Sequence, residues 1–446
     1  MRIMIVGAGQ VGYYLAQKLS VEGQNVVLVD RDASKLRILE RELNILTVQG
    51  SGASTRVLEE AGIDQTDLFI AVTDSDEVNL VACIISKEYN VKTRIARVRN
   101  EDFYTQGSAL SQQSLGIDLL ISPDLAMTEE IIKLATRSEA FEVAEFAGGQ
   151  VVLLGYVVHE DNPCVGKRLF NIRGLKGVIV AMLRGETTII PRGEDEIHVD
   201  DKIYLVTRKN DIPEVESLFN VASNPPKRVF IIGGGRIGYL LARRMERMKI
   251  DVRIVEKDYE RCNFLTENLE HSVVLHSHGL EAHDMLEEGV DRADLVVSVT
   301  NKDSVNILSS LLAKHHGAGK CITHIFRPDF IPMLDALGID VALSPRLVAA
   351  NMILRFVRGG GTIAVATLLA SNAEVIEIKV PEKGSFLDIP LKNLHVPRGA
   401  IIGAIVREGR VLIPFGETVL WPDDNLIVFF TSDSMAAVHE FFEITA

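Results

Sequence analysis

The sequence has 446 residues, of which 47% are hydrophobic and 24% are charged, and its formal net charge is −14. This composition is typical of a globular protein with a large core, and the negative charge disfavours nucleic acid and anionic lipid as partners. No apolar run reaches the roughly 18 residues of a membrane-spanning helix, and the start of the chain does not resemble a signal peptide. The four cysteines lie far apart with no CxxC pair, which favours reduced packing residues over disulfides or zinc ligands. We therefore expect a cytoplasmic protein.

The chain opens with a β-branched run at residues 3–6, which predicts a buried parallel strand. A glycine-rich segment follows, Gly7-Ala8-Gly9-Gln10-Val11-Gly12, and a helix is expected to begin near Gln10. In such a segment the first glycine makes a tight turn, the second lets the backbone approach a pyrophosphate, and the third lets the helix pack close to the strand. The amino terminus of the helix also directs its dipole at the phosphates. Strand, spacing and helix together predict a nucleotide-binding loop.

An acidic residue, Asp30, follows the next hydrophobic run. A carboxylate at this distance from the glycines can accept hydrogen bonds from the ribose hydroxyls of an adenosine. It also disfavours a 2′-phosphate, so NAD(H) or an adenine nucleotide is expected in preference to NADP. The opposing interpretation of the loop is a Rossmann-like domain that has kept its fold and lost its ligand.

The other strands of this unit are predicted at residues 45–48, 68–72 and 94–98, with helices at 54–61 and 77–89. Strands that alternate with helices predict a doubly wound parallel sheet. Ligands of such sheets bind at the carboxyl ends of the strands. This rule brings five further residues towards the same crevice: Gly50, Ser51, Thr73, Asp74 and Arg97. Arg97 could reach a phosphate, and the alternative for it is a surface ion pair with a helix carboxylate.

Ser122-Pro123 predicts the start of a helix that runs to about Arg137. Its apolar stripe either belongs to a core or packs between halves or subunits, and the sequence leaves both open. From residue 151 to residue 207 the pattern changes to short alternating strands, which predicts a small β-rich domain of about 80 residues. A linker at residues 222–227 follows.

The whole order is then repeated, which identifies a tandem duplication in two halves of about 220 residues. Gly233-Gly234-Gly235-Arg236-Ile237-Gly238 repeats the glycine loop, Glu256 repeats Asp30, and Ser344-Pro345 repeats the later helix start. The predicted fold is α/β, with two tandem Rossmann-like parallel-sheet domains, each followed by a small α+β domain. The four domains are expected at residues 1–138, 139–222, 223–365 and 366–446.

Each half is therefore expected to hold one nucleotide. The predicted contacts are Gly7, Gly9, Gln10, Val11, Gly12, Asp30, Gly50, Ser51, Thr73, Asp74 and Arg97 in the first half, and Gly233, Gly235, Arg236, Ile237, Gly238, Glu256 and Thr300 in the second. Arg236 replaces Gln10 in the second loop, and its charge suits a polyphosphate such as ATP or ADP. We therefore hypothesise that the halves prefer different nucleotides, NAD(H) in the first and ATP or ADP in the second.

Two other classes of function compete with nucleotide sensing. An NAD-dependent oxidoreductase would need a catalytic His, Lys or Tyr beside a substrate pocket, but His159 and His198 have no counterparts in the second small domain. A metal sensor could use His276, His278 and His283, yet no further ligand stands at a fixed spacing from them. We therefore expect neither catalysis nor a metal site.

The full-length pattern resembles the TrkA family, the regulatory subunits of Trk-type potassium uptake systems, whose units are known as RCK or KTN domains. The residues that carry the resemblance are the GAGQVG loop, Asp30, the Thr73-Asp74 segment and a Pro-x-Gly and Asp-Asp kernel in each small domain. The resemblance implies a cytoplasmic ring, a homotetramer, held on the inner face of the membrane by a TrkH-like channel subunit. Nucleotide binding, by NAD(H) or by ATP and ADP, would then control potassium flow. The chain departs from its own repeat at His324, which replaces Arg97, and at Ser277-His278-Gly279, which replaces Gly50-Ser51-Gly52.

Overall fold

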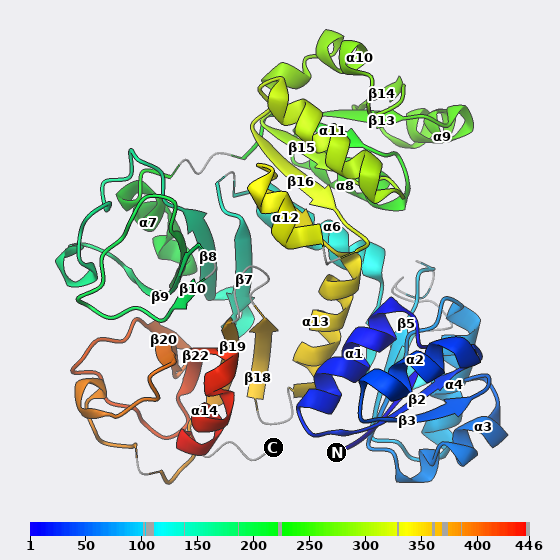
Figure 1. Ribbon diagram of the computed structural model, residues 1–446, viewed down its shortest axis with the longest axis horizontal. Coiled ribbons are helices and arrows are strands. Elements are labelled where there is room, and N and C mark those ends of the chain that lie inside the picture. The colour runs from blue at the N-terminus through cyan, green and yellow to red at the C-terminus, as the bar shows by residue number, and fades with distance from the viewer. Residues whose placement is uncertain are drawn as a thin grey trace.

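The computed structural model contains two six-stranded and two five-stranded sheets. It describes residues 1–100, 103, 111–137, 139–185, 187–221, 225–327, 330–358, 362–367, 373–384 and 386–442, so residues 222–224, the first half of the predicted linker, lie outside the described residues. Figure 1 shows the first Rossmann-like domain in blue, the second in green, and the two small domains together on the other side of the molecule.

The first domain is a parallel sheet in the order β3-β2-β1-β4-β5-β6, with Ile3 of β1 paired to Val26 and to Leu68. Both faces of β1 are buried, because helices cover the sheet on each side. The strands are β1 (Arg2–Val6), β2 (Asn25–Asp30), β3 (Leu46–Gln49), β4 (Leu68–Ala71), β5 (Thr93–Arg97) and β6 (Leu119–Ile121), and the helices are α1 (Gln10–Val21), α2 (Ala33–Glu42), α3 (Thr55–Glu60), α4 (Asp76–Glu88) and α5 (Gln112–Leu115).

The second domain repeats this arrangement in the order β14-β13-β12-β15-β16-β17. Its strands are β12 (Arg228–Ile232), β13 (Asp251–Glu256), β14 (Val273–His276), β15 (Leu295–Ser298), β16 (Lys320–His324) and β17 (Val341–Leu343), and its helices are α8 (Arg236–Arg247), α9 (Tyr259–Asn268), α10 (Ala282–Glu287), α11 (Asp303–His315) and α12 (Ile331–Ala336). The strand expected at residues 322–326 ends at His324, because the amides of Phe326 and Arg327 donate to the Asp303 carboxylate instead of to a strand. The two parallel sheets confirm the predicted fold class.

Each small domain is an antiparallel sheet with a short helix after its last strand, which accounts for the predicted α+β class. The first contains β7 (Glu142–Phe146), β8 (Val151–Val157), β9 (Gly177–Arg184), β10 (Thr187–Ile189), β11 (Lys202–Arg208) and α7 (Ile212–Leu218); the second contains β18 (Thr362–Thr367), β19 (Ala373–Lys379), β20 (Ala400–Arg407), β21 (Arg410–Leu412), β22 (Asn425–Thr431) and α14 (Met435–Phe441). The Asp-Asp kernel is structural: the buried Asp201 accepts two 2.8 Å bonds from Arg184, and Asp424 accepts the same pair from Arg407.

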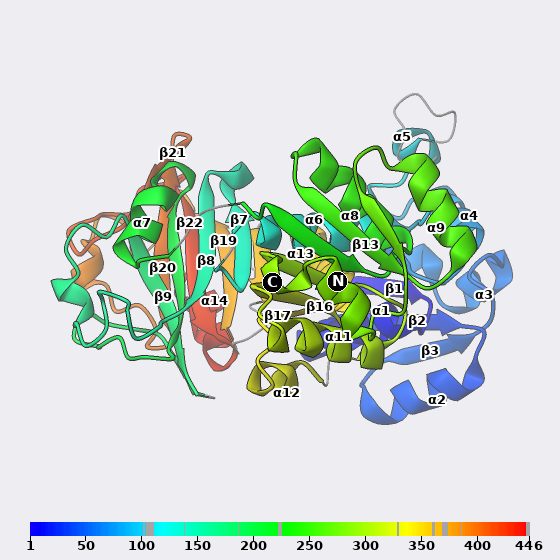
Figure 2. The ribbon, with the colours of Figure 1, turned by 90° about the horizontal axis from the view of Figure 1, so that it is seen from above.

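Two long helices cross between the halves. Helix α6 (Pro123–Ala135) leaves the first domain and packs on α8 of the second, while α13 (Pro345–Arg358) leaves the second domain and packs on α1 of the first. Figure 1 shows α13 lying along α1, and Figure 2 shows α6 and α13 between the small domains and the parallel sheets. Ala349, Ala350, Ile353 and Leu354 of α13 share one core with Ile3, Ile5 and Leu15. The apolar stripes of these helices therefore belong to cores, and these cores are shared between the halves.

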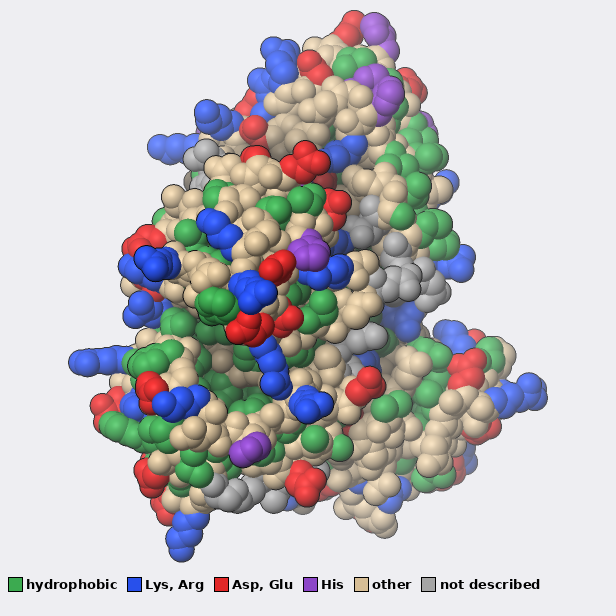
Figure 3. Space-filling model, turned by 60° about the vertical axis from the view of Figure 1, so that its left-hand side comes forward, with side chains coloured by type: hydrophobic (Ala, Val, Ile, Leu, Met, Phe, Trp, Pro, Cys, Tyr) green, Lys and Arg blue, Asp and Glu red, His purple; other side chains and the backbone are tan. Residues whose placement is uncertain are grey.

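The two small domains also form a common core. Val180, Tyr204 and Phe146 of the first pack with Ala404 and Phe429 of the second, and the rings of Phe146 and Phe429 meet edge to face at 6.4 Å. On the face shown in Figure 3, basic and acidic side chains are interspersed, so the net negative charge does not gather into a single patch there. Within the described residues, no helix has both the length and the apolar character needed to cross a bilayer.

Candidate nucleotide-binding sites

The first glycine loop has the geometry that its sequence predicts. Gly7 has a φ of 111°, and a Cβ atom there would lie 2.9 Å from the Thr73 amide nitrogen. A Cβ atom on Gly12 would lie 1.8 Å from the Gly7 carbonyl oxygen, whereas one on Gly9 would meet nothing within 4 Å. The loop thus needs Gly7 and Gly12 in order to close, and it keeps open space beside Gly9, where a phosphate would approach.

The second loop has the same construction. Gly233 has a φ of 108° and approaches the Thr300 amide, and a Cβ atom on Gly238 would lie 2.0 Å from the Gly233 carbonyl oxygen. A Cβ atom on Gly235 would meet nothing within 4 Å, as at Gly9. The duplication seen in sequence is therefore a duplication of loop geometry.

Both predicted acids lie directly beside their loops. Asp30 accepts hydrogen bonds from the amides of Ala8, at 2.5 Å, and Asp32, at 2.8 Å. Glu256 accepts from the amide of Gly234 at 2.8 Å, and its other oxygen accepts from the two amides that follow it. An ionised carboxylate has about four acceptor positions, so Asp30 and Glu256 each retain at least one position that a ribose hydroxyl can use.

A buried asparagine holds each predicted threonine loop, and sequence reasoning missed both. Asn79 on α4 accepts from the amide and hydroxyl of Thr73, at 2.9 and 2.7 Å, and donates to the carbonyls of Thr73 and Arg97. Asn306 on α11 makes the same four contacts with Thr300 and the carbonyl of His324. Both asparagines are fully buried. The sequence does hold a signal for these residues, because an asparagine occurs at equivalent positions on the apolar faces of the two repeated helices.

Arg97 is engaged with the loop that follows β4. It donates to the carbonyl of Thr73 and to the carboxylate of Asp74, both at 2.9 Å, and Arg99 lies 3.4 Å from the same carboxylate oxygen. The hydrogen bond from Arg97 lowers the pKa of Asp74, although partial burial opposes that shift. The predicted alternative of an ion pair is thus the observed state, with a loop carboxylate in place of a helix carboxylate.

The second crevice lacks this pair of opposite charges. His324 occupies the place of Arg97 and Asn301 that of Asp74. The His324 ring is 3% exposed, its centroid lies 4.3 Å from that of Phe326, and neither ring nitrogen has a hydrogen-bond partner in the described part of the chain. Burial lowers the pKa of His324 to about 4, with a small opposing effect from Asp303. The ring is therefore neutral at physiological pH.

The remaining predicted contacts differ in what they offer. Ser51 accepts a 2.8 Å bond from Arg31, a residue that the sequence reasoning passed over although it directly follows Asp30. Gly50 allows close packing on Val57. In the helices, Gln10 is exposed and Val11 half-buried, whereas the Ile237 side chain lies in the core, so only its backbone can face a ligand.

Arg236 does not point at its own loop in this structure. Its Nη2 donates to the carbonyl of Arg99 in the first half, and its Nε lies 3.2 Å from a carboxylate oxygen of Asp124 on α6. The guanidinium that was expected to serve a phosphate of the second site therefore bridges to the first half. In the other half, Arg346 of α13 stands at the position equivalent to Asp124. It makes a different kind of contact, because its guanidinium lies over the rings of Tyr13 and Tyr14.

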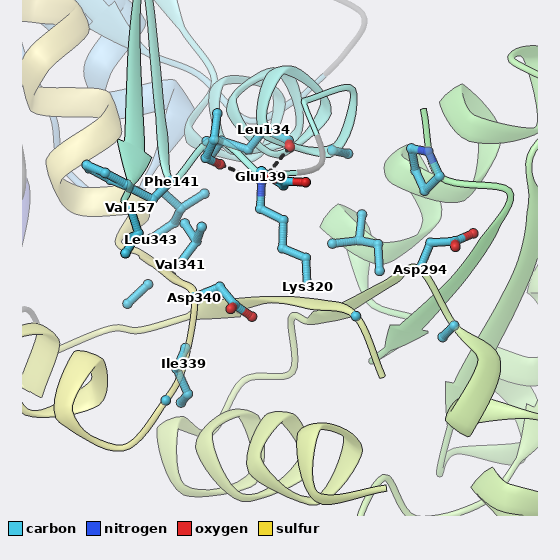
Figure 4. Close-up of a pocket in the computed structure, with 18 of the residues that line it drawn as sticks. Leu134, Glu139, Phe141, Val157, Asp294, Lys320, Ile339, Asp340, Val341 and Leu343 are labelled. Atoms are coloured by element: carbon cyan, nitrogen blue, oxygen red, sulfur yellow. Dashed lines mark hydrogen bonds between the residues drawn. The ribbon is translucent and has the colours of Figure 1, made fainter. Parts of the chain in front are cut away.

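A separate cavity of about 870 Å³ lies far from both loops, at the amino ends of β15, β16 and β17. Figure 4 shows Lys320 rising from the start of β16 towards the end of α6. Its Nζ donates to the carbonyls of Leu134, Arg137 and Ala140 at 2.7, 3.0 and 2.6 Å. Burial lowers the pKa of Lys320 to about 7, but three carbonyl acceptors favour the ammonium, which alone supplies three donors. Lys320 of the second half is thus hydrogen-bonded to the first half.

The histidines suggested as metal ligands have other contacts. His276 Nε2 lies 3.0 Å from the carbonyl of Lys257, and His283 pairs with Glu287 on the surface of α10. In the part of the chain that the structure describes, no cluster of three or more His, Cys, Asp or Glu side chains is arranged to hold a metal ion.

Comparison with known proteins identifies the domains. The TrkA-N domain model matches residues 3–123 and 229–345, and the TrkA-C domain model matches residues 153–220 and 375–443. Among curated relatives, the Trk system potassium uptake protein TrkA of Halomonas elongata is 36% identical over 96% of this chain and 95% of its own length. TrkA homolog 2 of Methanosarcina mazei is 33% identical over 99% of this chain and 100% of its own.

Solved structures share the fold. The GsuK channel bound to NAD superposes with a TM-score of 0.62 at 20% identity, covering 100% of this chain and 79% of that one. The structure of the GsuK RCK domain superposes with a TM-score of 0.62 at 21% identity, and the match covers 100% of this chain and 95% of that one. Domain matches over most of the chain, together with full-length relatives above 30% identity, place the chain in the TrkA family of Trk system potassium uptake proteins.

Proposed function

We propose that this protein is a nucleotide-sensing regulatory subunit of a potassium uptake system. The observation that carries the proposal is the duplicated loop: Gly7, Gly12 and Asp30 build the same phosphate-facing turn as Gly233, Gly238 and Glu256. Relatives named as potassium uptake proteins, matched over 95% and 100% of their own lengths, supply the process that such sites would regulate.

The ligands that fit best are NAD(H) at the first site and ATP or ADP at the second. An acid beside each loop favours free ribose hydroxyls over a 2′-phosphate. The second loop carries Arg236, which can supply charge-assisted donors to a terminal phosphate once it leaves Asp124. The other predicted contacts stay part of this proposal, because they lie in the glycine loops or at the carboxyl ends of the strands, where ligands of such sheets bind. They are Gln10, Val11, Gly50, Ser51, Thr73, Asp74 and Arg97 in the first site, and Thr300 and the backbone of Ile237 in the second.

Binding at either loop can change the shape of the molecule, because each loop begins a helix that the other half covers. Helix α1 is packed under α13, and α8 under α6. A nucleotide that fits one arrangement of the halves better than another shifts the population towards that arrangement. Couplings of about 1–3 kcal/mol per site are usual, and several sites in one assembly would add to a decisive switch.

The partner in this proposal is a TrkH-like membrane subunit, beneath which the protein forms a homotetrameric ring on the cytoplasmic face. Potassium selectivity then belongs to the partner, and this chain supplies control without catalysis. The duplicated sites support that view over an NAD-dependent oxidoreductase, because His159 and His198 of the first small domain do not recur in the second.

The test is calorimetric titration of the purified protein with NADH, NAD, ATP and ADP. Asp30→Ala and Glu256→Ala are expected to weaken one site each by about tenfold or more, through lost ribose contacts. Asp67→Ala and Asp294→Ala are matched controls, because these acids also accept backbone amides but lie at the amino ends of the same sheets.

The expected result is two saturable sites, each weakened by the substitution of its own acid and unaffected by its control, with no turnover of NADH. Potassium flux through a reconstituted TrkH-like partner should then depend on nucleotide. An absence of saturable binding in the wild type, or NADH oxidation with a carbonyl substrate, would overturn the proposal.

A further inference from the structure

Arg236 is the one predicted ligand-binding side chain that the structure places across the boundary between the halves. It stands at the first residue of α8, directly after Gly235, so it is within reach of a phosphate at the second loop. Its guanidinium nevertheless lies against Asp124 at the start of α6 and the carbonyl of Arg99. A terminal phosphate at the second loop would therefore compete with Asp124 for this cation.

Arg99 carries this contact to the first nucleotide site. Its amide donates to Asp76 in the first turn of α4, at 2.8 Å, and its guanidinium lies 3.4 Å from Asp74. Asp74 in turn pairs with Arg97, which also binds the carbonyl of Thr73. A continuous series of charged and hydrogen-bonded contacts therefore runs from the second glycine loop to the crevice of the first.

The charged side chains of this series are not repeated in the reverse direction, although the amide of Phe326 donates to Asp303 as that of Arg99 does to Asp76. The positions equivalent to Arg236, Asp124, Arg99 and Asp74 are held by Gln10, Arg346, Phe326 and Asn301. Glutamine cannot form an ion pair with arginine, and a phenylalanine side chain cannot bind an asparagine through charge. Among the described residues, the first loop therefore has no comparable charged link to the second crevice, and this asymmetry gives Arg236 a role of its own.

We infer that Arg236 couples the two nucleotide sites of one chain by exchanging between Asp124 and the terminal phosphate of a nucleotide at the second site. When a phosphate draws Arg236 away, Arg99 loses its contact with the second half, and the Asp74 segment of the first site is less firmly held. ATP at the second site thus weakens binding at the first, and by reciprocity the first ligand weakens ATP. This inference rests on the proposed nucleotide-binding function and adds its regulation.

The measurement is titration of the full-length protein with ATP, used as a common probe because its free ribose hydroxyls suit the acid at either site. Asp30→Ala reports the second site alone and Glu256→Ala the first site alone. The coupling factor is the overall association constant for two ATP molecules in the wild type divided by the product of these single-site constants. We expect a factor of about 0.2 or lower, within the usual range of allosteric coupling.

Arg236→Gln and Asp124→Asn, each made in all three backgrounds, should bring this factor to one. They should differ at the second site: Arg236→Gln weakens ATP there, whereas Asp124→Asn tightens it, because the competitor for the guanidinium is gone. Arg346→Gln is the matched control, since it removes a cross-half contact at the position equivalent to Asp124 and should leave the factor as in the wild type.

A factor of one in the wild type, or a factor unchanged in both variants while both sites still bind ATP, would refute the coupling and leave the proposed function intact. Loss of all ATP and NADH binding in the wild type would instead refute the proposed function, and the coupling with it. Tighter ATP binding in Asp124→Asn together with an unchanged factor would assign Arg236 to its own site alone.

Discussion

Gly9 and Gly12 lie in the same turn but meet different surroundings. A methyl group on Gly12 would collide with the Gly7 carbonyl, whereas Gly9 has a φ of −74°, which any residue adopts, and open space around it. We expect Gly12→Ala to destabilise the protein by about 1–3 kcal/mol, as overpacking does. Gly9→Ala should leave stability nearly unchanged, yet weaken NADH binding at the first site by at least about tenfold, because its methyl group occupies the phosphate approach.

Urea unfolding and calorimetric titration of the two variants separate these effects. Gly235→Ala provides the same test at the second loop, where the added methyl group also meets open space. Unaltered nucleotide affinity in Gly9→Ala would mean that the phosphate does not approach this loop.

The neutral, buried ring of His324 makes stability depend on pH. Its pKa is about 4 in the folded chain because burial disfavours the charged form, against about 6.5 when unfolded. Between these values the unfolded chain binds a proton that the folded chain does not, so stability falls as pH decreases from 6.5 towards 4. The slope from this one group is at most about 1.4 kcal/mol per pH unit.

His324→Leu should remove that slope and stabilise the protein below pH 6, measured as the difference between wild-type and variant unfolding free energies. His278→Gln removes an exposed histidine and serves as the control. Parallel pH profiles for the wild type and His324→Leu would show that the ring gains a partner when protonated.

At the scale of elements, the end of α6 depends on a residue of the other half. Lys320 donates to three carbonyls there, satisfying groups that the end of any helix leaves unpaired. Lys320→Met removes these donors, and we expect a loss of about 1–3 kcal/mol in unfolding free energy. Hydrogen exchange should accelerate in the last turn of α6 and remain unchanged in the small domains.

Lys314→Met is the matched control for this prediction. Lys314 binds the carbonyl of Gly319 and the carboxylate of Asp340, both inside the second domain. Its loss should not affect exchange in α6. If Lys320→Met left α6 as protected as in the wild type, apolar packing alone would hold that helix.

The sequence predicted elements well where local patterns determine them. The β-branched run before each glycine loop forms β1 and β12, and the Ser-Pro pairs begin α6 and α13 as expected. It could not decide where those helices pack, because an apolar stripe requires burial without specifying the partner. The direction of Arg236 was missed for a related reason: glycine spacing places its backbone, but the acid that attracts its side chain lies on a helix from the other half.

At the scale of the whole molecule, the crossing helices make each half incomplete without the other. Ile353 and Leu354 are almost fully buried in the core of the first domain, although they belong to the second half. Burial of two such side chains contributes about 3–6 kcal/mol as an upper estimate. That is comparable with the net stability of a typical domain, about 5–15 kcal/mol.

We therefore predict that residues 1–221 and 225–446 produced separately do not give folded monomers. Each fragment keeps its own crossing helix with no partner, so α6 or α13 would expose its apolar face, and the fragment would aggregate or exchange that helix with a second copy. Co-expression should instead yield a 1:1 complex that unfolds cooperatively near the temperature of the intact chain, as judged by light scattering and circular dichroism. A monomeric fragment 1–221 with cooperative unfolding at the temperature of the intact chain would show that α13 adds little to the first core.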